Sequence, residues 1–433
     1  MDTVDIAIVA AFVVAYSIIS AHLSTTVITG PMVYVLFGVI VGPDALNIVD
    51  LSLDNEVVRT LAELTLVLIL YTDASRIDIG VLHRDSEIPL RLLAVAMPLT
   101  IALGVGFGAL LFSDLGFWEV ALLAAILAPT DAALGQAVVT NPRVPVRIRQ
   151  ALNVESGLND GIAVPFITLF IAGSLGTVGL QDADFWIEFA LKQIGFGLLI
   201  GVSVGLVGAW IVDHSTHAGW ISHSFQRLAI IALAILAFAL AESIDGNGFI
   251  AAFVAGLSVG NMTRHHKGKL LDFSEQEGEL LALLTFMIFG AAFLGAALDD
   301  LTWRVALYAV LGVSIIRFVP VAISLIGMRL HYETVVFLSW FGPRGLASIV
   351  FGLLVLETTE IAGREEIFLV AVCTVLLSVV AHGLTAQPGA RWYGQRTEIM
   401  AEAPGRPELQ AVDELPVRAR PASERGTTSG SPR

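Results

Sequence analysis

Long apolar stretches, separated by short polar or Gly/Pro-containing segments, recur along nearly the whole chain. Many approach the roughly 20 residues that an α-helix needs to cross about 30 Å of hydrocarbon. The pattern predicts thirteen spans, which start near residues 5, 27, 56, 90, 118, 147, 186, 227, 247, 279, 303, 333 and 365. We therefore expect an all-α polytopic membrane domain over residues 1–394.

Basic residues alternate between successive predicted loops. Most Lys and Arg residues follow the third, fifth, seventh, ninth, eleventh and thirteenth spans, and an excess of these residues marks cytoplasmic loops. This pattern places the N-terminus outside and the C-terminus in the cytoplasm. The first span lacks a preceding Lys or Arg, so we expect a retained helix and not a cleaved signal peptide. Residues 395–433 are rich in Pro, Arg, Glu, Ser and Gly, which predicts a disordered cytoplasmic tail.

Composition supports the membrane assignment and excludes other classes. Hydrophobic residues make up 56% of the chain and charged residues 15%, with a mean hydropathy of +0.80. The net charge of -15 argues against nucleic-acid binding, which needs a basic surface to neutralise phosphates. Cys373 is the single cysteine, so the chain offers neither an internal disulfide nor a cysteine metal cluster. We expect no cofactor.

The sixth predicted span carries a group of polar residues in the run ALNVESGLNDGIAVPF. On an α-helix, Ser156 and Asp160 lie on one stripe, and Glu155 and Asn159 lie on the stripe beside it. An ionisable group in a span is costly, and small hard cations prefer oxygen ligands of these types. The run therefore predicts a cation site, although a polar seam between helices is an alternative.

Two further spans are interrupted by Pro and Gly. Pro129–Asp131 interrupts the fifth span and Gly342–Gly345 interrupts the twelfth. A pair of such interruptions indicates an inverted-repeat transporter with its site at the midplane. Asp131 is placed to neutralise positive half-helix ends and Arg344 negative ones, leaving carbonyls such as that of Thr130 for a cation. The alternative is a pair of ordinary proline kinks.

Arg317 stands alone in the apolar eleventh span and needs a partner. Glu155 is the most economical candidate, since their pairing would leave Asp160 as the titrating carboxylate of the sixth span. Arg317 near a span end could instead extend its guanidinium to the interface. Asp73 falls near the expected cytoplasmic end of the third span, where it is either a vestibule group or a solvated residue.

Three motifs together resemble the monovalent cation:proton antiporter family, specifically its NhaP-type electroneutral sodium/proton antiporters. They are APTDAA at residues 128–133, NVESGLNDGIAVP at 153–165 and GPRGLAS at 342–348, supported by YTDASRI and the arginine of the eleventh span. The resemblance covers all thirteen predicted spans. It implies a homodimer with a moving core bundle that includes the fifth, sixth, eleventh, twelfth and thirteenth spans.

The resemblance also implies roles for individual residues. Asp160 would bind sodium and a proton alternately, and Ser156 and the Thr130 backbone would help to hold the ion. The wider ion-binding region would add three residues, Asp131, Asn159 and Asp73. Glu155 and Arg317 would form a buried ion pair, while Asp131 and Arg344 would compensate charge where the interrupted helices cross.

The expected activity is secondary active exchange of sodium, with lithium as a further candidate, for protons, and not enzyme catalysis. Electrogenic relatives carry an aspartate where this chain has Asn159, so we expect one proton per cation. A potassium/proton antiporter of the same fold is the main alternative. An intramembrane hydrolase would need a metal or nucleophile motif, which is missing, and a channel would need a continuous pore. We expect a cell (inner) membrane location and a role in sodium and pH homeostasis.

Overall fold

The computed structural model describes residues 3–23, 26–48, 55–176, 183–263, 271–400, 407–410 and 412. Within these residues the chain is helical and contains no strand. The helices of the first part of the chain run as α1 (Thr3–Leu23), α2 (Gly30–Val41), α3 (Asn55–Arg76), α4 (Ile79–Arg84), α5 (Glu87–Arg91), the π-helical turn η1 (Leu92–Ala96), α6 (Met97–Leu111), α7 (Phe117–Ile126), α8 (Ala132–Val139) and α9 (Val146–Ser174).

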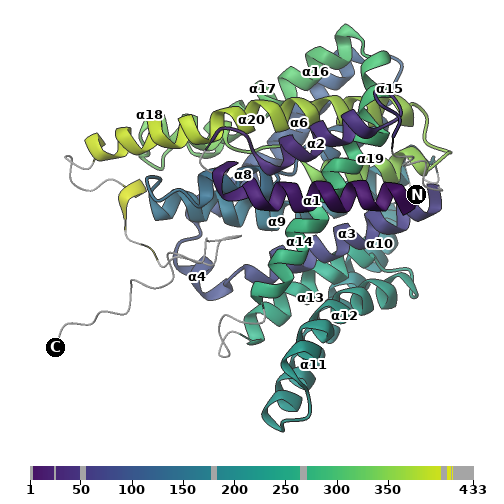
Figure 1. Cartoon of the computed structure of the whole chain (residues 1–433), viewed down its shortest axis with the longest axis vertical. Coiled ribbons are helices and arrows are strands. Elements are labelled where there is room, and N and C mark those ends of the chain that lie inside the picture. The colour runs from purple at the N-terminus through teal and green to yellow at the C-terminus, as the bar shows by residue number, and fades with distance from the viewer. Residues whose placement is uncertain are drawn as a thin grey trace.

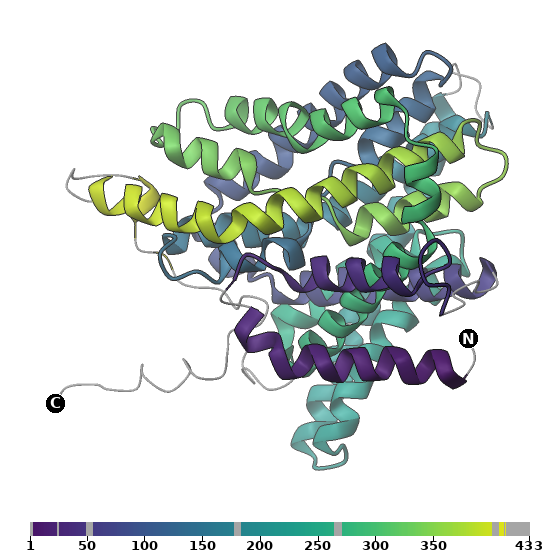
Figure 2. The same cartoon turned by 45° about the horizontal axis from the view of Figure 1, so that its top comes forward.

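The second part continues with elements of the same kind. They are α10 (Ala183–Ala190), the π-helical turn η2 (Leu191–Phe196), α11 (Gly197–His217), α12 (His223–Glu242), α13 (Gly248–Met262), α14 (Leu271–Ala292), α15 (Leu294–Asp299), α16 (Trp303–Val313), α17 (Ile315–Ser324), α18 (Tyr332–Trp340), α19 (Leu346–Glu357), α20 (Arg364–Met400) and the 3-10 turn η4 (Pro407–Leu409). The long α20 runs through much of the bundle, and α1 and α2 lie along one side (Figures 1 and 2).

The all-α prediction is confirmed for the described residues, and helices begin near the predicted span starts. In the part of the chain that the structure describes, six helical segments are long and apolar enough to cross a membrane, and six shorter apolar helices accompany them. Both predicted interruptions are present: residues 127–131 separate α7 from α8, and residues 341–345 separate α18 from α19. Pro at 129 and Pro at 343 remove a backbone donor in each break, which explains why neither helix continues.

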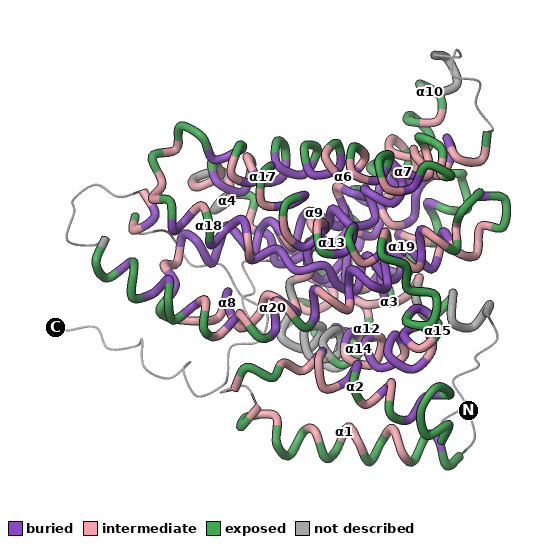
Figure 3. Tube along the Cα trace, turned by 90° about the horizontal axis from the view of Figure 1, so that it is seen from above, coloured by how far each residue is buried: buried purple, intermediate pink, exposed green. Residues whose placement is uncertain are grey.

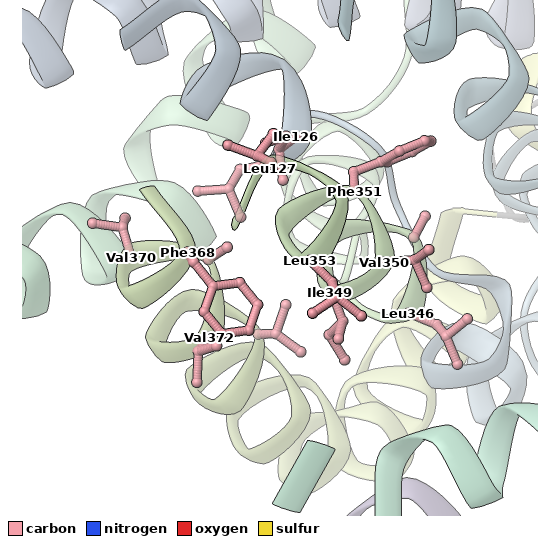
Figure 4. Packing of buried hydrophobic residues seen from close by; sticks show 14 of the residues in the cluster. Ile126, Leu127, Leu346, Ile349, Val350, Phe351, Leu353, Phe368, Val370 and Val372 are labelled. Carbon is pink, nitrogen blue, oxygen red and sulfur yellow. The ribbon is translucent and has the colours of Figure 1, made fainter. Parts of the chain in front are cut away.

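A large part of the interior is an apolar, closely packed cluster of side chains. Ile126 and Leu127 at the end of α7 belong to the same buried cluster as Phe351 of α19 and Phe368 of α20 (Figure 4). Most residues of α7, α9 and α19 are buried, while α1 is largely exposed at the edge of the bundle (Figure 3). An exposed apolar helix is expected where lipid or another protein is the surrounding medium.

Glycines allow the helices beside the centre to approach closely. A Cβ at Gly256 of α13 would collide with the carbonyl oxygen of Tyr71 on α3, and one at Gly260 with that of Ser75. The two glycines are four residues apart and lie on one face of α13. Small residues at this spacing let two helix backbones come into contact, which stabilises packing where water supplies no hydrophobic driving force.

The C-terminal region differs from the expected disordered tail over residues 395–433. Helix α20 continues to Met400, where Thr397 is buried and bonds to its own helix. Glu408 of η4 is also fully buried and accepts a 3.2 Å hydrogen bond from the backbone N–H of His331. Arg147 donates to the carbonyl oxygen of Pro407 at 2.7 Å. Specific polar contacts order a segment that composition alone assigns to disorder; residues 401–406, 411 and 413–433 lie outside the described residues.

Candidate functional site

Polar side chains of α9 meet the first helix break in the buried centre. The Thr130 hydroxyl lies 3.1 Å from the Ser156 hydroxyl and accepts a 2.6 Å hydrogen bond from the Asn159 amide nitrogen. Thr130, Asn159 and Asp160 are buried, and Asp160 follows Ser156 by one helical turn. The side chains of Ser156, Asn159 and Asp160 therefore lie within two turns of α9, and Thr130 contacts two of them from the break.

We name Thr130, Ser156, Asn159 and Asp160 the α9 cluster, and two features of it concern ligand binding. The Asn159 amide oxygen is buried and makes no hydrogen bond to any residue that the structure describes. A cavity of about 10 Å³, close to the space that one water occupies, is lined by Ser156 and Pro343 among others. An unsatisfied buried oxygen is costly, so a hydrogen-bond donor or a cation is favoured beside the Asn159 amide oxygen.

Asp131 caps two helices at once. One carboxylate oxygen accepts hydrogen bonds from the backbone N–H groups of Ala133 and Leu134, at 2.7 and 3.0 Å, in the first turn of α8. The other oxygen accepts a 2.8 Å bond from the Leu346 N–H, the first residue of α19. The Asp131 N–H donates to the Pro343 carbonyl oxygen at 2.7 Å. Positive N-terminal ends of both half-helices thus converge on one carboxylate.

The second break needs its two glycines because side chains press against them. A Cβ on Gly345 would collide with the Asp131 carboxylate, and a Cβ on Gly342 would collide with the Arg317 guanidinium. Any larger residue at either position would displace a charged group. The GPRG sequence is therefore explained by close approach from both sides of the break.

Glu155 and Arg317 form a bidentate ion pair between α9 and α17. The guanidinium donates to the two carboxylate oxygens at 2.7 and 3.0 Å, and both side chains are at most 5% exposed. Arg317 also lies 3.4 Å from the carbonyl oxygen of Leu338 in α18. Parallel hydrogen bonds offset the cost of burying the two charges and join α9 to the second interrupted helix.

The negative C-terminal ends of the half-helices are covered by separate donors. Arg344 is 1% exposed and donates from its guanidinium to the Gly342 carbonyl oxygen just after α18. Ser348 of α19 donates a 2.8 Å hydrogen bond to the carbonyl oxygen of Ile126, the last residue of α7. Sequence reasoning assigned this task to Arg344 alone and missed Ser348.

Asp73 lies on α3 next to the polar run of α9, and its backbone oxygen is near Gly157 within that run. Its carboxylate accepts a 3.2 Å hydrogen bond from the Arg76 guanidinium, and both residues are buried. The structure therefore brings Asp73 next to α9, where it is bound to a basic partner that sequence reasoning did not assign.

Two residues of α20 also reach the second break and were missed from the sequence. The Ser378 hydroxyl accepts a 2.6 Å hydrogen bond from the Arg344 N–H, and His382 Nε2 lies 3.0 Å from the carbonyl oxygen of Trp340, the last residue of α18. Both side chains are at most 1% exposed. A signal existed: His382 is an ionisable residue in an apolar run, the criterion that singled out Arg317.

Comparisons with known proteins agree with this geometry. Residues 8–392 match the family described as sodium/hydrogen exchanger, transmembrane. The chain is 27% identical to a K(+)/H(+) antiporter NhaP of Alkalimonas amylolytica, covering 90% of this chain and 67% of that protein. It is 28% identical to the Na(+)/H(+) antiporter NhaG of Bacillus atrophaeus, covering 66% of this chain and 54% of that protein. The chain thus spans about two thirds or less of the length of these relatives.

The fold is shared with a solved structure. The sodium proton antiporter MjNhaP1 of Methanocaldococcus jannaschii superposes with a TM-score of 0.72 at 20% identity, covering 90% of this chain and 98% of that one. The family match extends over nearly the whole helical domain, including both breaks and the α9 cluster. The chain is therefore a multi-pass membrane protein that belongs to the sodium/hydrogen exchanger family.

Proposed function

We propose that this protein is a secondary active antiporter that exchanges one sodium ion for one proton. The observation that carries the proposal is the α9 cluster, in which buried Asp160 follows Asn159 on α9 and lies one turn from Ser156, and both of these residues contact Thr130 at a helix break. Burial makes the ionised form of a carboxylate costly, which favours its neutralisation by a proton or a cation. That preference supports exchange of the two at one site.

The proposed mechanism is competition combined with alternating access. Ionised Asp160, with oxygens of Ser156 and Thr130, binds sodium; protonated Asp160 does not. Either occupied form lacks net charge at the site and lets the core helices move between the two sides of the membrane, whereas the empty carboxylate resists movement through a low-dielectric region. Asp131 and Arg344 keep the half-helix ends compensated throughout, and Glu155 with Arg317 ties α9 to α17.

One-for-one exchange follows from the neutral residue before Asp160. Asn159 donates its amide hydrogen to Thr130 and carries no charge. Glu155 is already paired with Arg317. Asp160 is then the one carboxylate on this turn of α9 that alternates between proton and cation, so exchange moves no net charge.

The wider architecture forms part of the same proposal. We place thirteen spans in the cell (inner) membrane, with the N-terminus outside and the C-terminus in the cytoplasm, following the distribution of Lys and Arg. The two interrupted helices support inverted repeats that cross at the midplane. We further propose a homodimer, with a moving core that includes α7 to α9 and α16 to α20, serving sodium and pH homeostasis. No cofactor takes part in the proposed cycle.

Potassium/proton exchange is the second candidate. It is favoured by relatives named K(+)/H(+) antiporter, from Alkalimonas amylolytica and from Shewanella species, whereas the Bacillus relative is named Na(+)/H(+) antiporter. Carboxylate, hydroxyl and carbonyl oxygens accept either ion. Proton flux measured with lithium, sodium and potassium separately distinguishes the candidates: the proposal requires sodium to give the lowest half-saturating concentration or to share it with lithium.

A fluorescent pH dye in everted vesicles tests the function directly. Wild type should release a preformed proton gradient when sodium is added, and Asp160→Asn should match vesicles without the protein. Asn159→Asp adds a second carboxylate and should make exchange sensitive to membrane potential. Activity of Asp160→Asn at the wild-type rate, or wild-type exchange that varies with clamped potential, would reject the proposed mechanism.

A further inference from the structure

Helix α20 contributes two residues that bridge both ends of the second break. Ser378 accepts the backbone N–H of Arg344 at 2.6 Å, at the end of the break that leads into α19. His382 lies one turn further along α20, and its Nε2 lies 3.0 Å from the carbonyl oxygen of Trp340, where α18 ends. The two side chains lie 3.1 Å apart, from the Ser378 hydroxyl to His382 Nδ1. Together they form a continuous polar chain along the break.

The hydrogen-bond partners of Ser378 and His382 indicate where the protons of this polar chain lie. Trp340 offers a carbonyl oxygen, so His382 Nε2 carries a hydrogen and donates it. The Ser378 oxygen receives the Arg344 N–H, which leaves the serine hydroxyl hydrogen to donate to Nδ1. Nδ1 also lies 3.0 Å from the Ser378 carbonyl oxygen, but a hydrogen there would remove the acceptor of the serine hydroxyl. A neutral imidazole that carries its hydrogen on Nε2 satisfies these contacts.

The surroundings fix the ring and oppose a positive charge on it. The Trp340 indole lies 5.2 Å from the imidazole, centroid to centroid, and donates its own N–H to Thr385 at 2.9 Å. Two arginines, Arg344 from the break and Arg317 from α17, are close enough to the ring to interact with it electrostatically. Both are positive, so a neutral imidazole avoids a third cation in the same buried region.

We infer that Ser378 and His382 are positioning residues for ion exchange. As an uncharged, hydrogen-bonded pair, they hold the second break in the position in which it contacts Asp131. The break must present the Pro343 carbonyl oxygen to the Asp131 N–H and the Leu346 N–H to the Asp131 carboxylate. Thr130 directly precedes Asp131, so the same contacts fix one ligand of the α9 cluster. This inference rests on the proposed exchange function.

Substitutions in reconstituted protein distinguish a positioning role of Ser378 and His382 from a role in which His382 titrates. His382→Leu removes the donor and the acceptor and should raise the half-saturating sodium concentration about ten-fold, the size expected for losing one buried hydrogen bond. His382→Gln keeps a donor and an acceptor but cannot titrate, and should stay within about two-fold of wild type with an unchanged pH profile. Ser378→Ala should not add to the effect of His382→Leu in the double variant, because both break one chain.

The matched control is Thr374→Val, which removes another buried α20 hydroxyl, one that bonds to Val370 of its own helix; its kinetics should match wild type. The inference is overturned if His382→Gln is as impaired as His382→Leu, shifts the pH profile, or if the serine and histidine effects multiply. If wild type itself exchanges no ions, the proposed function fails. Thermal unfolding still tests the positioning role, because His382→Leu must then melt at a lower temperature than His382→Gln.

Discussion

The break between α7 and α8 and the break between α18 and α19 expose the same kinds of unsatisfied backbone groups, yet they are compensated differently. The two N-terminal ends share one carboxylate, that of Asp131. The two C-terminal ends are covered by several donors, which are Arg344, Ser348 and His382. Compensation of the positive helix ends therefore depends on one residue, while compensation of the negative ends is distributed over three elements.

The breaks also differ in how they connect to α9. The first break contacts α9 through the neutral hydroxyl of Thr130, bonded to Ser156 and Asn159. The second is connected through charge, because Arg317 packs against Gly342 and pairs with Glu155. Neutral contacts suit a site whose ligand changes, and a strong ion pair suits a connection that stays closed during transport.

The largest effect is expected from breaking the charged connection. Glu155→Gln leaves the Arg317 guanidinium buried without its carboxylate and should lower the free energy of unfolding by about 3–5 kcal/mol. The double variant Glu155→Gln/Arg317→Gln should recover part of that loss, since neither member of the pair then carries a charge. Thermal unfolding of the purified protein in detergent measures both.

The control for that experiment is Lys192→Gln, which breaks the largely exposed pair with Glu188 and should leave the melting temperature unchanged. A double variant less stable than Glu155→Gln would contradict the assignment, because the remaining guanidinium would then not be the source of the loss.

Removing the shared cap is the next largest change. Asp131→Ala leaves the first N–H groups of α8 and α19 unsatisfied, and two lost caps in a buried site should lower the exchange rate about 100-fold. Asp131→Asn keeps one oxygen acceptor and should fall between that variant and wild type. Initial rates of dye recovery in vesicles, normalised to the amount of protein, provide the measurement.

Glu188→Gln removes a largely exposed acid on α10 and serves as the matched control. Wild-type rates in Asp131→Ala would show that the two N-terminal ends are compensated by something else.

A smaller effect is expected at the negative ends. Arg344→Lys keeps the charge but cannot reproduce the guanidinium geometry at the Gly342 carbonyl, and should reduce exchange about ten-fold. The remaining donors, Ser348 and His382, should limit the loss. Rates below those of Asp131→Ala would reverse the ranking and show that compensation of the negative ends also depends on one residue.

The smallest effect belongs to Ser348→Ala, which removes one donor from the Ile126 carbonyl oxygen at the end of α7. One neutral hydrogen bond is worth about 1 kcal/mol, so we expect a two- to five-fold lower rate in the same assay. Thr358→Val is the control, because that hydroxyl bonds only to the preceding turn of α19 in the described residues. A loss as large as that of Arg344→Lys would show that the donors are not independent.

Some of this arrangement follows from sequence because membrane burial makes charge and proline informative. Lone charges in apolar runs need partners, so the sequence alone predicts that Glu155 pairs with Arg317. Pro at 129 and 343 marked both breaks, and the lengths of the apolar runs located the helices. The role of Asp160 as the exchanging acid remains a proposal.

Other parts depend on contacts that no local pattern encodes. Ser348 and Ser378 are neutral and common in helices, so nothing in the sequence indicates that they satisfy carbonyl or N–H groups of distant breaks. The burial of Glu408 against the start of α18 depends on a segment returning to the helices after residues that composition assigns to disorder. Asp73 was assigned without its partner Arg76, although the two share a helix face.

Competition between sodium and protons at Asp160 is the central claim, and the pH dependence of sodium affinity tests it most directly. Initial exchange rates in proteoliposomes, measured over a range of sodium concentrations at several pH values, give the half-saturating concentration and the maximal rate. The account predicts that, in the acidic range, the half-saturating sodium concentration rises about ten-fold for each unit by which the pH is lowered, because one proton excludes one cation. The maximal rate should stay constant. A constant half-saturating concentration with a falling maximal rate would contradict it.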